Sequence, residues 1–253
     1  MNNRVVLALT GAERTDFLQG LVTNDVRQAA HGIVYTALLT PQGKYLADFF
    51  VIGQPDRLLI DVAADLAPRL MQRLAMYRLR ADVQIAATDL VVSLGTGSPP
   101  DGALPDPRHP ALGWRFYGTT DVSDATDWAA IRVAELIPQS GVELTPDTYI
   151  LEAGFERLHG VDFRKGCFVG QEIVARMKHK TVLRKGLVRV AVDGVAHAGD
   201  EISSNGRPAG VLHTVAGDRA IAWLRFDRAT NLRTSEATIT PLAGEIPGVI
   251  TNS

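Results

Sequence analysis

The chain has a single cysteine, Cys167, among its 253 residues. One cysteine excludes an internal disulfide and a metal site made only of cysteine. None of the six histidines shows metal-ligand spacing to another histidine. We therefore expect no resident metal, and a protein suited to a reducing compartment.

Long apolar runs and an excess of basic residues are also missing. No stretch approaches the roughly 20 apolar residues of a membrane span. The apolar run at residues 5–9 is too short for a signal-peptide core. The net charge of −2 argues against a general nucleic-acid binder, which is usually basic. We therefore expect a cytoplasmic protein with no membrane partner and no direct nucleic-acid partner.

The hydrophobic pattern predicts an α+β fold in the first part of the chain. Thr10 and Glu13 have the spacing of a capping box, which predicts that a helix starts there. A second helix is expected to bury Leu70 and Leu74. The strands are expected at residues 33–39, 45–52, 58–62, 83–86 and 90–94.

From about Gly186 the pattern changes to short alternating strands with frequent turns. Asn205-Gly206 is a strong signal for a two-residue hairpin turn. No helical period is present in this region, which indicates a small β-barrel. Between the two patterns, residues 95–113 are rich in glycine, proline and aspartate and are expected to form a loop or junction.

Cys167 lies in the stretch FRKGCFVGQEIVARM, residues 163–177. A helix is expected from Gln171, and its N-terminal amides together with Arg164 and Lys165 would favour a thiolate at Cys167. Glycines on both sides would let a ligand approach the backbone closely. The alternative interpretation is a buried cysteine that only fills space.

Two carboxylates stand in apolar surroundings, and each has two interpretations. Asp48 lies between Ala47 and Phe49 in an expected strand. It is either an edge or solvent-facing carboxylate, or an acid buried beside a ligand. Glu152 is either a charge at a helix end or a functional carboxylate.

The string KGCFVGQE, residues 165–172, resembles the K-G-C-[YF]-x-G-Q-E signature of the YgfZ-type folate-binding proteins. That family assists iron–sulfur cluster assembly and repair and is related to the glycine-cleavage T-protein, an aminomethyltransferase. The stretches FLQGLVTNDV, LLTPQGKYLADFFV and GRPAGVLHTV are also similar to the family, so the resemblance covers nearly the whole chain. Position 168 is Phe where the family more often has Tyr.

The resemblance implies a GcvT-like α+β fold with two interlocked ferredoxin-like halves around a central folate cleft. The T-protein-like region would span residues 1–185, with halves of roughly 1–95 and 96–185. A small C-terminal β-barrel would follow at residues 186–253. The implied cofactor is tetrahydrofolate or a derivative. The implied partners are iron–sulfur proteins or their assembly machinery, bound transiently.

The resemblance also assigns roles to residues. It implies Cys167 and Asp48 as catalytic residues, with Asp48 placed beside the reactive folate nitrogen. Glu152 falls where T-proteins bind the pterin ring, and a carboxylate suits paired N–H donors. The implied cofactor-binding residues are Glu152, Lys165, Gly166, Gly170, Gln171 and Arg176.

Two functions are compatible with these residues. The first is a folate-binding accessory factor for iron–sulfur proteins that acts through Cys167. The second is an aminomethyltransferase or other one-carbon transferase in which Asp48 is the acid–base group. A T-protein needs no cysteine for its chemistry, so the signature around Cys167 favours the first function.

Overall fold

The computed structural model describes residues 3–246. The chain forms two compact units, and each is discontinuous in sequence. The first contains the residues up to Thr126 together with Phe155–Arg176. The second combines Asp127–Gly154 with the residues from Met177 onward. The expected division of residues 1–185 into halves near residue 95 stays a prediction.

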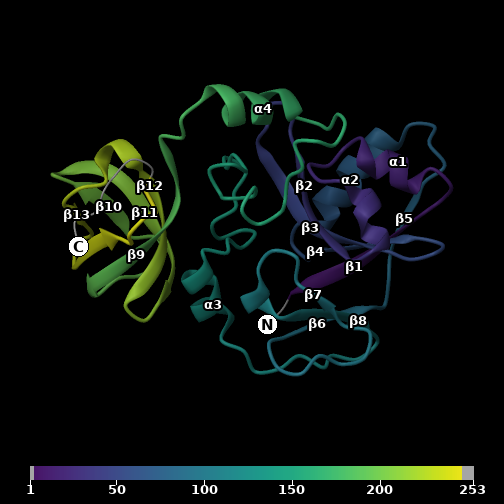
Figure 1. Cartoon of the computed structure of the whole chain (residues 1–253), viewed down its shortest axis with the longest axis horizontal. Helices are drawn as coiled ribbons and strands as arrows, with labels where there is room; N and C mark the ends of the chain where they lie inside the picture. Colours follow the sequence, from purple (N-terminus) through teal and green to yellow (C-terminus); the bar gives the residue numbers. More distant parts are fainter. Residues whose placement is uncertain (1–2, 247–253) are drawn as a thin grey trace. The chain divides into compact units, whose positions relative to one another are not determined.

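The first unit is built on an antiparallel five-stranded sheet in the order β2-β3-β4-β1-β5. Its helices α1 and α2 and the 3-10 helix η1 accompany this sheet (Figure 1). Leucines and valines from helices and strands share one buried core. The elements are β1 (Arg4–Thr10), α1 (Arg14–Gln19), η1 (Val26–Ala30), β2 (Ile33–Leu39), β3 (Tyr45–Gly53), β4 (Leu58–Ala63), α2 (Ala67–Arg78) and β5 (Gln84–Ala87).

The strands predicted in this region are confirmed within about a residue, but the capping box is wrong. Thr10 is the last residue of β1, a strand in the interior of the sheet that contains the apolar run of residues 5–9. Glu13 occupies the N-cap position of α1 without a side-chain capping bond. Its carboxylate instead accepts a hydrogen bond from the Asp82 amide. The apolar run at residues 5–9 is long enough to form a strand. Pairing of this strand with its neighbours fixes the conformation of Thr10.

A second, three-stranded sheet of the same unit has the order β6-β8-β7. The strand predicted at residues 90–94 belongs to this sheet rather than to the larger one. The expected loop at residues 95–113 contains a two-residue strand and a 3-10 helix. The elements are β6 (Val91–Gly95), β7 (Leu104–Pro105), η2 (Pro110–Leu112) and β8 (Trp114–Gly118).

Buried charges join the two sheets. Asp61 on β4 pairs with Arg4 on β1 and with Arg115 on β8. Arg115 also reaches Asp106, at 3.1 Å, which in turn holds Arg108 at 2.8 Å. The side chains of Asp61 and Arg115 are 0% and 1% exposed. Each carboxylate therefore has two arginine partners in a region that excludes water.

The pKa values of these acids follow from their partners. Burial alone raises the pKa of Asp106, but the guanidinium groups of Arg108 and Arg115 lower it to about 2. Burial also opposes ionisation of Asp61, and Arg115 and Arg4 hold its pKa below the ordinary value. Both acids are thus charged at neutral pH, and the cluster is ionic.

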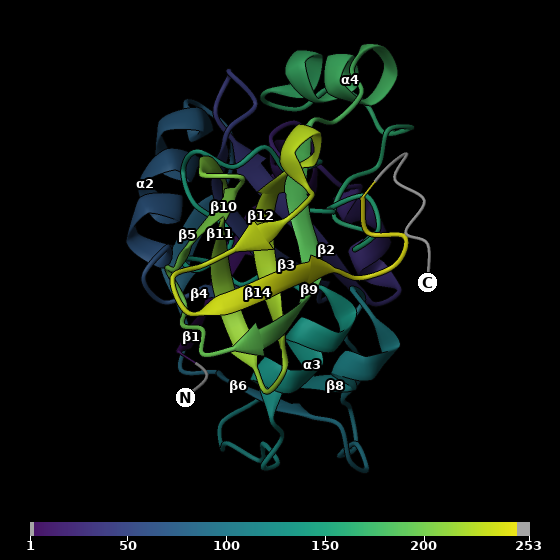
Figure 2. The ribbon, with the colours of Figure 1, turned by 90° about the vertical axis from the view of Figure 1, so that its left-hand side faces the viewer.

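The second unit contains a closed barrel of six strands. The Asn205-Gly206 hairpin turn is confirmed, because both residues have positive φ, 49° and 76°, between β10 and β11. Figure 2 shows β9, β12 and β14 on the face of the barrel turned to the viewer. The strands are β9 (Lys185–Gly194), β10 (Glu201–Ser204), β11 (Arg207–Ala216), β12 (Arg219–Arg225), β13 (Leu232–Arg233) and β14 (Ala237–Pro241).

Three helices complete the described elements. In the second unit, α3 (Trp128–Glu135) packs against β11 and β12, and η3 (Phe226–Arg228) follows the barrel strand β12. The helix α4 (Gln171–Lys180) begins where the sequence predicted. No helix among residues 3–246 is long and apolar enough to cross a membrane.

We expect Arg115→Met to destabilise the first unit by about 3–5 kcal/mol, because it leaves the buried charge of Asp61 with too little compensation. Arg57→Met is the matched control in the same unit, since Arg57 pairs with an exposed Asp56 at 3.5 Å. Its cost should stay below about 1 kcal/mol. Urea unfolding followed by fluorescence measures both, and Trp114 adjoins the substituted residue. Equal costs would contradict the role given to the buried cluster.

Candidate functional site

Two buried side chains hold the loop that carries Cys167. The Lys165 ammonium donates to the carbonyl oxygens of Gln19 and Val22, each at 2.7 Å, where α1 ends. Phe168 is buried, and the Lys165 Nζ lies 5.1 Å from its ring centroid. Between these two anchors Cys167 is exposed. The loop therefore exposes the Cys167 thiol while buried contacts on either side hold its backbone.

Backbone contacts hold the far side of the same loop. The Val169 amide donates to the Leu21 carbonyl at 3.3 Å. Gly170 has φ +82°, and a Cβ there would lie 2.6 Å from the Thr40 carbonyl oxygen. Gly170 is thus needed for packing against the turn between β2 and β3. A Cβ at Gly166 would meet nothing within 4 Å, so the space beside Cys167 is open.

These contacts change two expectations about the motif. The interpretation of Cys167 as a buried space-filler is wrong, because the residue is exposed. The sequence suggested that the charge of Lys165 would stabilise a thiolate at Cys167. In the structure its ammonium group donates hydrogen bonds to backbone carbonyl oxygens. Burial lowers the pKa of Lys165 to about 8. Within the motif, Lys165 and Phe168 are anchors and Gly166-Cys167 is the part presented to solvent.

Asp48 is buried in the interior of the five-stranded sheet. The solvent-facing interpretation is therefore wrong, since the residue is 3% exposed and β3 has neighbours on both sides. Its Oδ1 accepts a hydrogen bond from the Tyr45 hydroxyl at 2.6 Å, and its Oδ2 accepts one from the Tyr35 hydroxyl at 3.0 Å. A buried carboxylate with hydroxyl donors on both oxygens is held in one orientation.

Tyr35 connects Asp48 to the buried ionic cluster, and sequence reasoning missed it. Burial and the nearby Asp48 carboxylate raise the pKa of Tyr35 well above its ordinary value, so the hydroxyl stays protonated and donates. Its ring stacks on Phe155 with centroids 5.2 Å apart, and the Arg108 guanidinium lies 5.4 Å from its centroid. The only signal in the sequence was a tyrosine in a strand that neighbours the one with Asp48.

Glu152 belongs to the second compact unit and is 9% exposed. It lies in a series of tight turns, so the interpretation as a helix-end charge is wrong. Its Oε2 is 3.9 Å from the Lys185 Nζ. Its carbonyl oxygen accepts from the Leu187 amide at 2.9 Å. The side chain and the backbone of Glu152 thus both contact the start of β9.

The remaining predicted site residues lie on or near α4. Gln171 is its first residue and half-buried, and Arg176 is exposed. Both His159 and His179, the histidines nearest to the motif in sequence, are exposed. The structure brings Gln171 close to the Cys167 loop through its amide, which donates to the Phe168 carbonyl at 3.2 Å. Folate contacts of Gln171 and Arg176 stay predictions.

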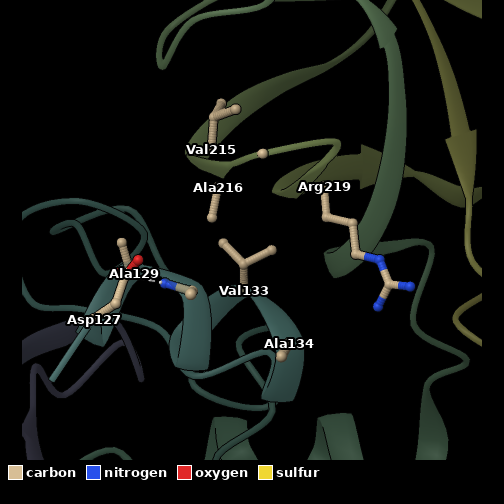
Figure 3. A pocket seen from close by; sticks show the side chains of 9 residues that line it. Asp127, Ala129, Val133, Ala134, Val215, Ala216 and Arg219 are labelled. Atoms are coloured by element: carbon tan, nitrogen blue, oxygen red, sulfur yellow. Dashed lines mark hydrogen bonds between the residues drawn. The ribbon is translucent and has the colours of Figure 1, made fainter.

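Among residues 3–246 no group of three or more His, Cys, Asp or Glu side chains is placed to hold a metal ion. A cavity of about 390 Å³ lies between α3 and the hairpin of β11 and β12 (Figure 3). Its wall is mostly alanine and valine, with Asp127 and Arg219 at its margins. None of the predicted site residues lines it.

Comparison with known proteins supplies the relatives of this chain. Residues 184–246 match the family described as "CAF17, C-terminal beta-barrel domain". An iron–sulfur cluster assembly factor IBA57 homolog of Mycosarcoma maydis is 31% identical over 74% of this chain and 55% of its own length. The iron–sulfur cluster assembly factor IBA57 of Mus musculus is 24% identical over 98% of this chain and 83% of its own length. The chain thus spans about half the length of the Mycosarcoma relative and of a Neurospora crassa relative, at 55% and 52%.

The names of these relatives correct one expectation. They are called mitochondrial, which contradicts the cytoplasmic location expected from the sequence. The names also differ from the expected YgfZ-type label, which denotes a related family.

A solved structure supports the predicted fold. Glycine cleavage system aminomethyltransferase T from Bartonella henselae superposes with a TM-score of 0.77 over 97% of this chain and 84% of that chain, at 13% identity. The GcvT-like α+β fold with a C-terminal barrel is thereby confirmed. The chain is similar over most of its length to iron–sulfur cluster assembly factors of the IBA57 type, and it has the fold of the glycine-cleavage aminomethyltransferases.

Proposed function

We propose that this protein is an accessory factor for iron–sulfur cluster assembly or repair that binds a folate and acts through Cys167. The observation that carries the proposal is the exposed thiol on a loop anchored by Lys165 and Phe168. Similarity to IBA57 assembly factors over 98% of the chain supports the pathway. The GcvT-like fold supports a folate as the bound cofactor.

The chemistry of a lone thiol limits what Cys167 does. Iron–sulfur clusters are held by several protein ligands, mostly cysteine thiolates. This chain has one cysteine, so any cluster that Cys167 ligates takes its other thiolate ligands from another molecule. Such a shared site needs a thiol that a second protein can reach, and the exposed Gly166-Cys167 pair satisfies that requirement.

For the folate, the chemistry of Glu152 fits a bound pterin. The aminopyrimidine edge of a pterin offers N–H donors, and a carboxylate accepts at about four lone-pair positions. In the structure the Glu152 Oε2 lies 3.9 Å from the Lys185 Nζ, and the residue is 9% exposed, so the carboxylate is held in an apolar setting suited to a ring with N–H donors. A bound folate would present a one-carbon carrier, with Glu152 fixing its ring.

We expect Cys167→Ser to abolish support of iron–sulfur enzymes in cells that lack the native protein, because a hydroxyl does not replace a thiolate as iron ligand. The melting temperature should stay within about 2 °C of the wild type, as expected for an exposed position. Aconitase activity and thermal unfolding are the two measurements. Iodoacetamide should alkylate the native wild-type thiol completely.

Two variants of the same loop separate anchoring from charge. Lys165→Met removes the hydrogen bonds to Gln19 and Val22 and should lower aconitase activity several-fold while the thiol remains alkylated. Arg164→Met removes a neighbouring cation whose side chain is 95% exposed, and it should behave like the wild type. Full complementation by Cys167→Ser would exclude the proposed role of the thiol.

We expect Glu152→Gln to weaken binding of tetrahydrofolate at least tenfold, consistent with the roughly 1.5–3 kcal/mol of a hydrogen bond to a charged group. Isothermal titration calorimetry measures the affinity. Lys185→Met is the control, since it removes the ion pair and keeps the carboxylate. If Lys185→Met weakens binding as much as Glu152→Gln, the carboxylate acts through the ion pair rather than on folate. A wild-type protein that binds no tetrahydrofolate would refute folate binding altogether.

A one-carbon transferase is the second candidate, and the buried Asp48 is the observation that favours it. A transferase would move the methylene carbon of an aminomethyl thioether donor to tetrahydrofolate and release ammonia and the donor's thiol, and Asp48→Asn should abolish turnover. The two tyrosine hydroxyls on Asp48 argue that its carboxylate is already engaged. Turnover is measured with the aminomethyl-lipoyl carrier of glycine cleavage as donor. Folate binding without turnover would remove this candidate.

A further inference from the structure

A second cavity, of about 460 Å³, lies in the first unit and has no part in the site described above. It is bordered by the start of α1, by η1 and by the turn that joins β3 to β4. None of the predicted site residues lines it. Its volume falls within the range of small-molecule sites in proteins, roughly 300–1,000 Å³.

The polar part of the cavity wall consists mainly of hydrogen-bond donors. Arg14 and Arg27 both line it, and among the described residues no Asp or Glu does. Thr15 adds a half-buried hydroxyl. The side-chain oxygen of Gln54 already accepts from the Arg57 Nε at 2.8 Å, so Gln54 offers its amide N–H groups. The wall therefore suits a ligand that accepts hydrogen bonds and has a negative charge.

Within residues 3–246, neither arginine is paired with a buried carboxylate. The half-buried Arg14 donates from Nη1 to the Gly11 carbonyl at 2.9 Å and from Nη2 to the Pro55 carbonyl at 3.0 Å. Its Nε is buried with no acceptor among the described residues. Arg27 lies 3.7 Å from Asp16, and their side chains are 63% and 85% exposed, so solvent weakens this pair.

A structural role explains only part of this arrangement. Through its two carbonyl bonds, Arg14 connects the residues before α1 to the turn between β3 and β4. Neutral N–H donors would hold the same carbonyl oxygens, so these bonds do not require a positive charge. A half-buried charge is stabilised by a counter-ion, and the space beside Arg14 is the cavity itself.

The rest of the wall is largely apolar. Val26 and Leu58 line the cavity and are 1% and 5% exposed, and Ala30 and Pro55 adjoin them. An inorganic anion would occupy a small part of the volume and leave this wall in contact with water. A ligand with an apolar body removes that water, which is favourable.

We propose that this cavity binds a small organic carboxylate. Its carboxylate group lies at Arg14 and Arg27, and its apolar body lies against Val26 and Leu58. A carboxylate fits better than a phosphate because Arg14 has committed an N–H of each Nη to a carbonyl, and a carboxylate needs fewer donors than the three oxygens of a phosphate. Enclosure in a cavity favours a small molecule over a protein, a nucleic acid or a membrane, which present larger surfaces.

Calorimetry with octanoate tests the proposal. We expect the wild type to bind octanoate with a Kd of roughly 1 mM or lower, as for a ligand of about ten non-hydrogen atoms. Octyl phosphate, 1-octanol and inorganic phosphate should each bind at least threefold more weakly. Arg27→Met should weaken octanoate binding at least fivefold, and Ala30→Trp, which fills the cavity, should abolish it. Both residues are exposed, so both variants should melt within about 2 °C of the wild type.

The matched control is Arg69→Met, which makes the same charge change at an exposed arginine of α2 that does not line the cavity. It should alter octanoate binding less than 1.5-fold. An equal loss in Arg69→Met would reduce the effect to net charge and overturn the proposal. Undiminished binding by Ala30→Trp would place octanoate elsewhere, with the same consequence.

The other ligands decide the chemistry of the site. If 1-octanol binds as tightly as octanoate, the arginines recognise no charge and the proposal fails. It also fails if octyl phosphate or inorganic phosphate binds more tightly than octanoate. Cys167→Ser should bind octanoate like the wild type, because the Cys167 loop does not line the cavity. The result is thus independent of the function proposed for the thiol.

Discussion

The first compact unit depends on the buried pair of Asp61 and Arg115. It joins a five-stranded sheet to a three-stranded one that shares no strand with it. Arg115 also stacks on Phe50, with 3.8 Å between its guanidinium carbon and the ring centroid. A buried charge without its partner costs several kcal/mol, so the sheets have one arrangement in which these charges are satisfied.

This cluster continues toward the buried acid of β3. Asp106 holds Arg108, the guanidinium of Arg108 lies over Tyr35, and the hydroxyl of Tyr35 donates to Asp48. Asp48 thus lies at the end of a structural network. The same contacts that stabilise the unit fix the orientation of Asp48.

The loop with Cys167 shows a different use of buried charge. The Lys165 ammonium donates hydrogen bonds to backbone carbonyl oxygens at the end of α1. These bonds hold a loop without regular secondary structure against the core. Cys167 remains exposed between Lys165 and Phe168 because the two buried residues hold the backbone on either side of it. A side chain can thus be accessible and held in place at the same time.

Sequence patterns determined several parts of this protein without help from the structure. The alternation of residues 33–39 and 45–52 located β2 and β3, and Asn205-Gly206 located a barrel hairpin, because strand periodicity and turn chemistry are local properties. The signature around Cys167 predicted the GcvT-like fold, which is confirmed. Local pattern also predicted the start of α4.

Tertiary structure decided what no local pattern contains. Thr10 could cap a helix or end a strand, and pairing of β1 with β4 and β5 selected the strand. Lys165 had the sequence context of a residue beside a thiol, but its partners, Gln19 and Val22, lie at and just after the end of α1, far away in the chain. Asp48 was ambiguous because burial depends on which strands flank β3. Partners distant in sequence set the roles of these residues, because side-chain contacts depend on the tertiary fold and not on the residues adjacent in sequence.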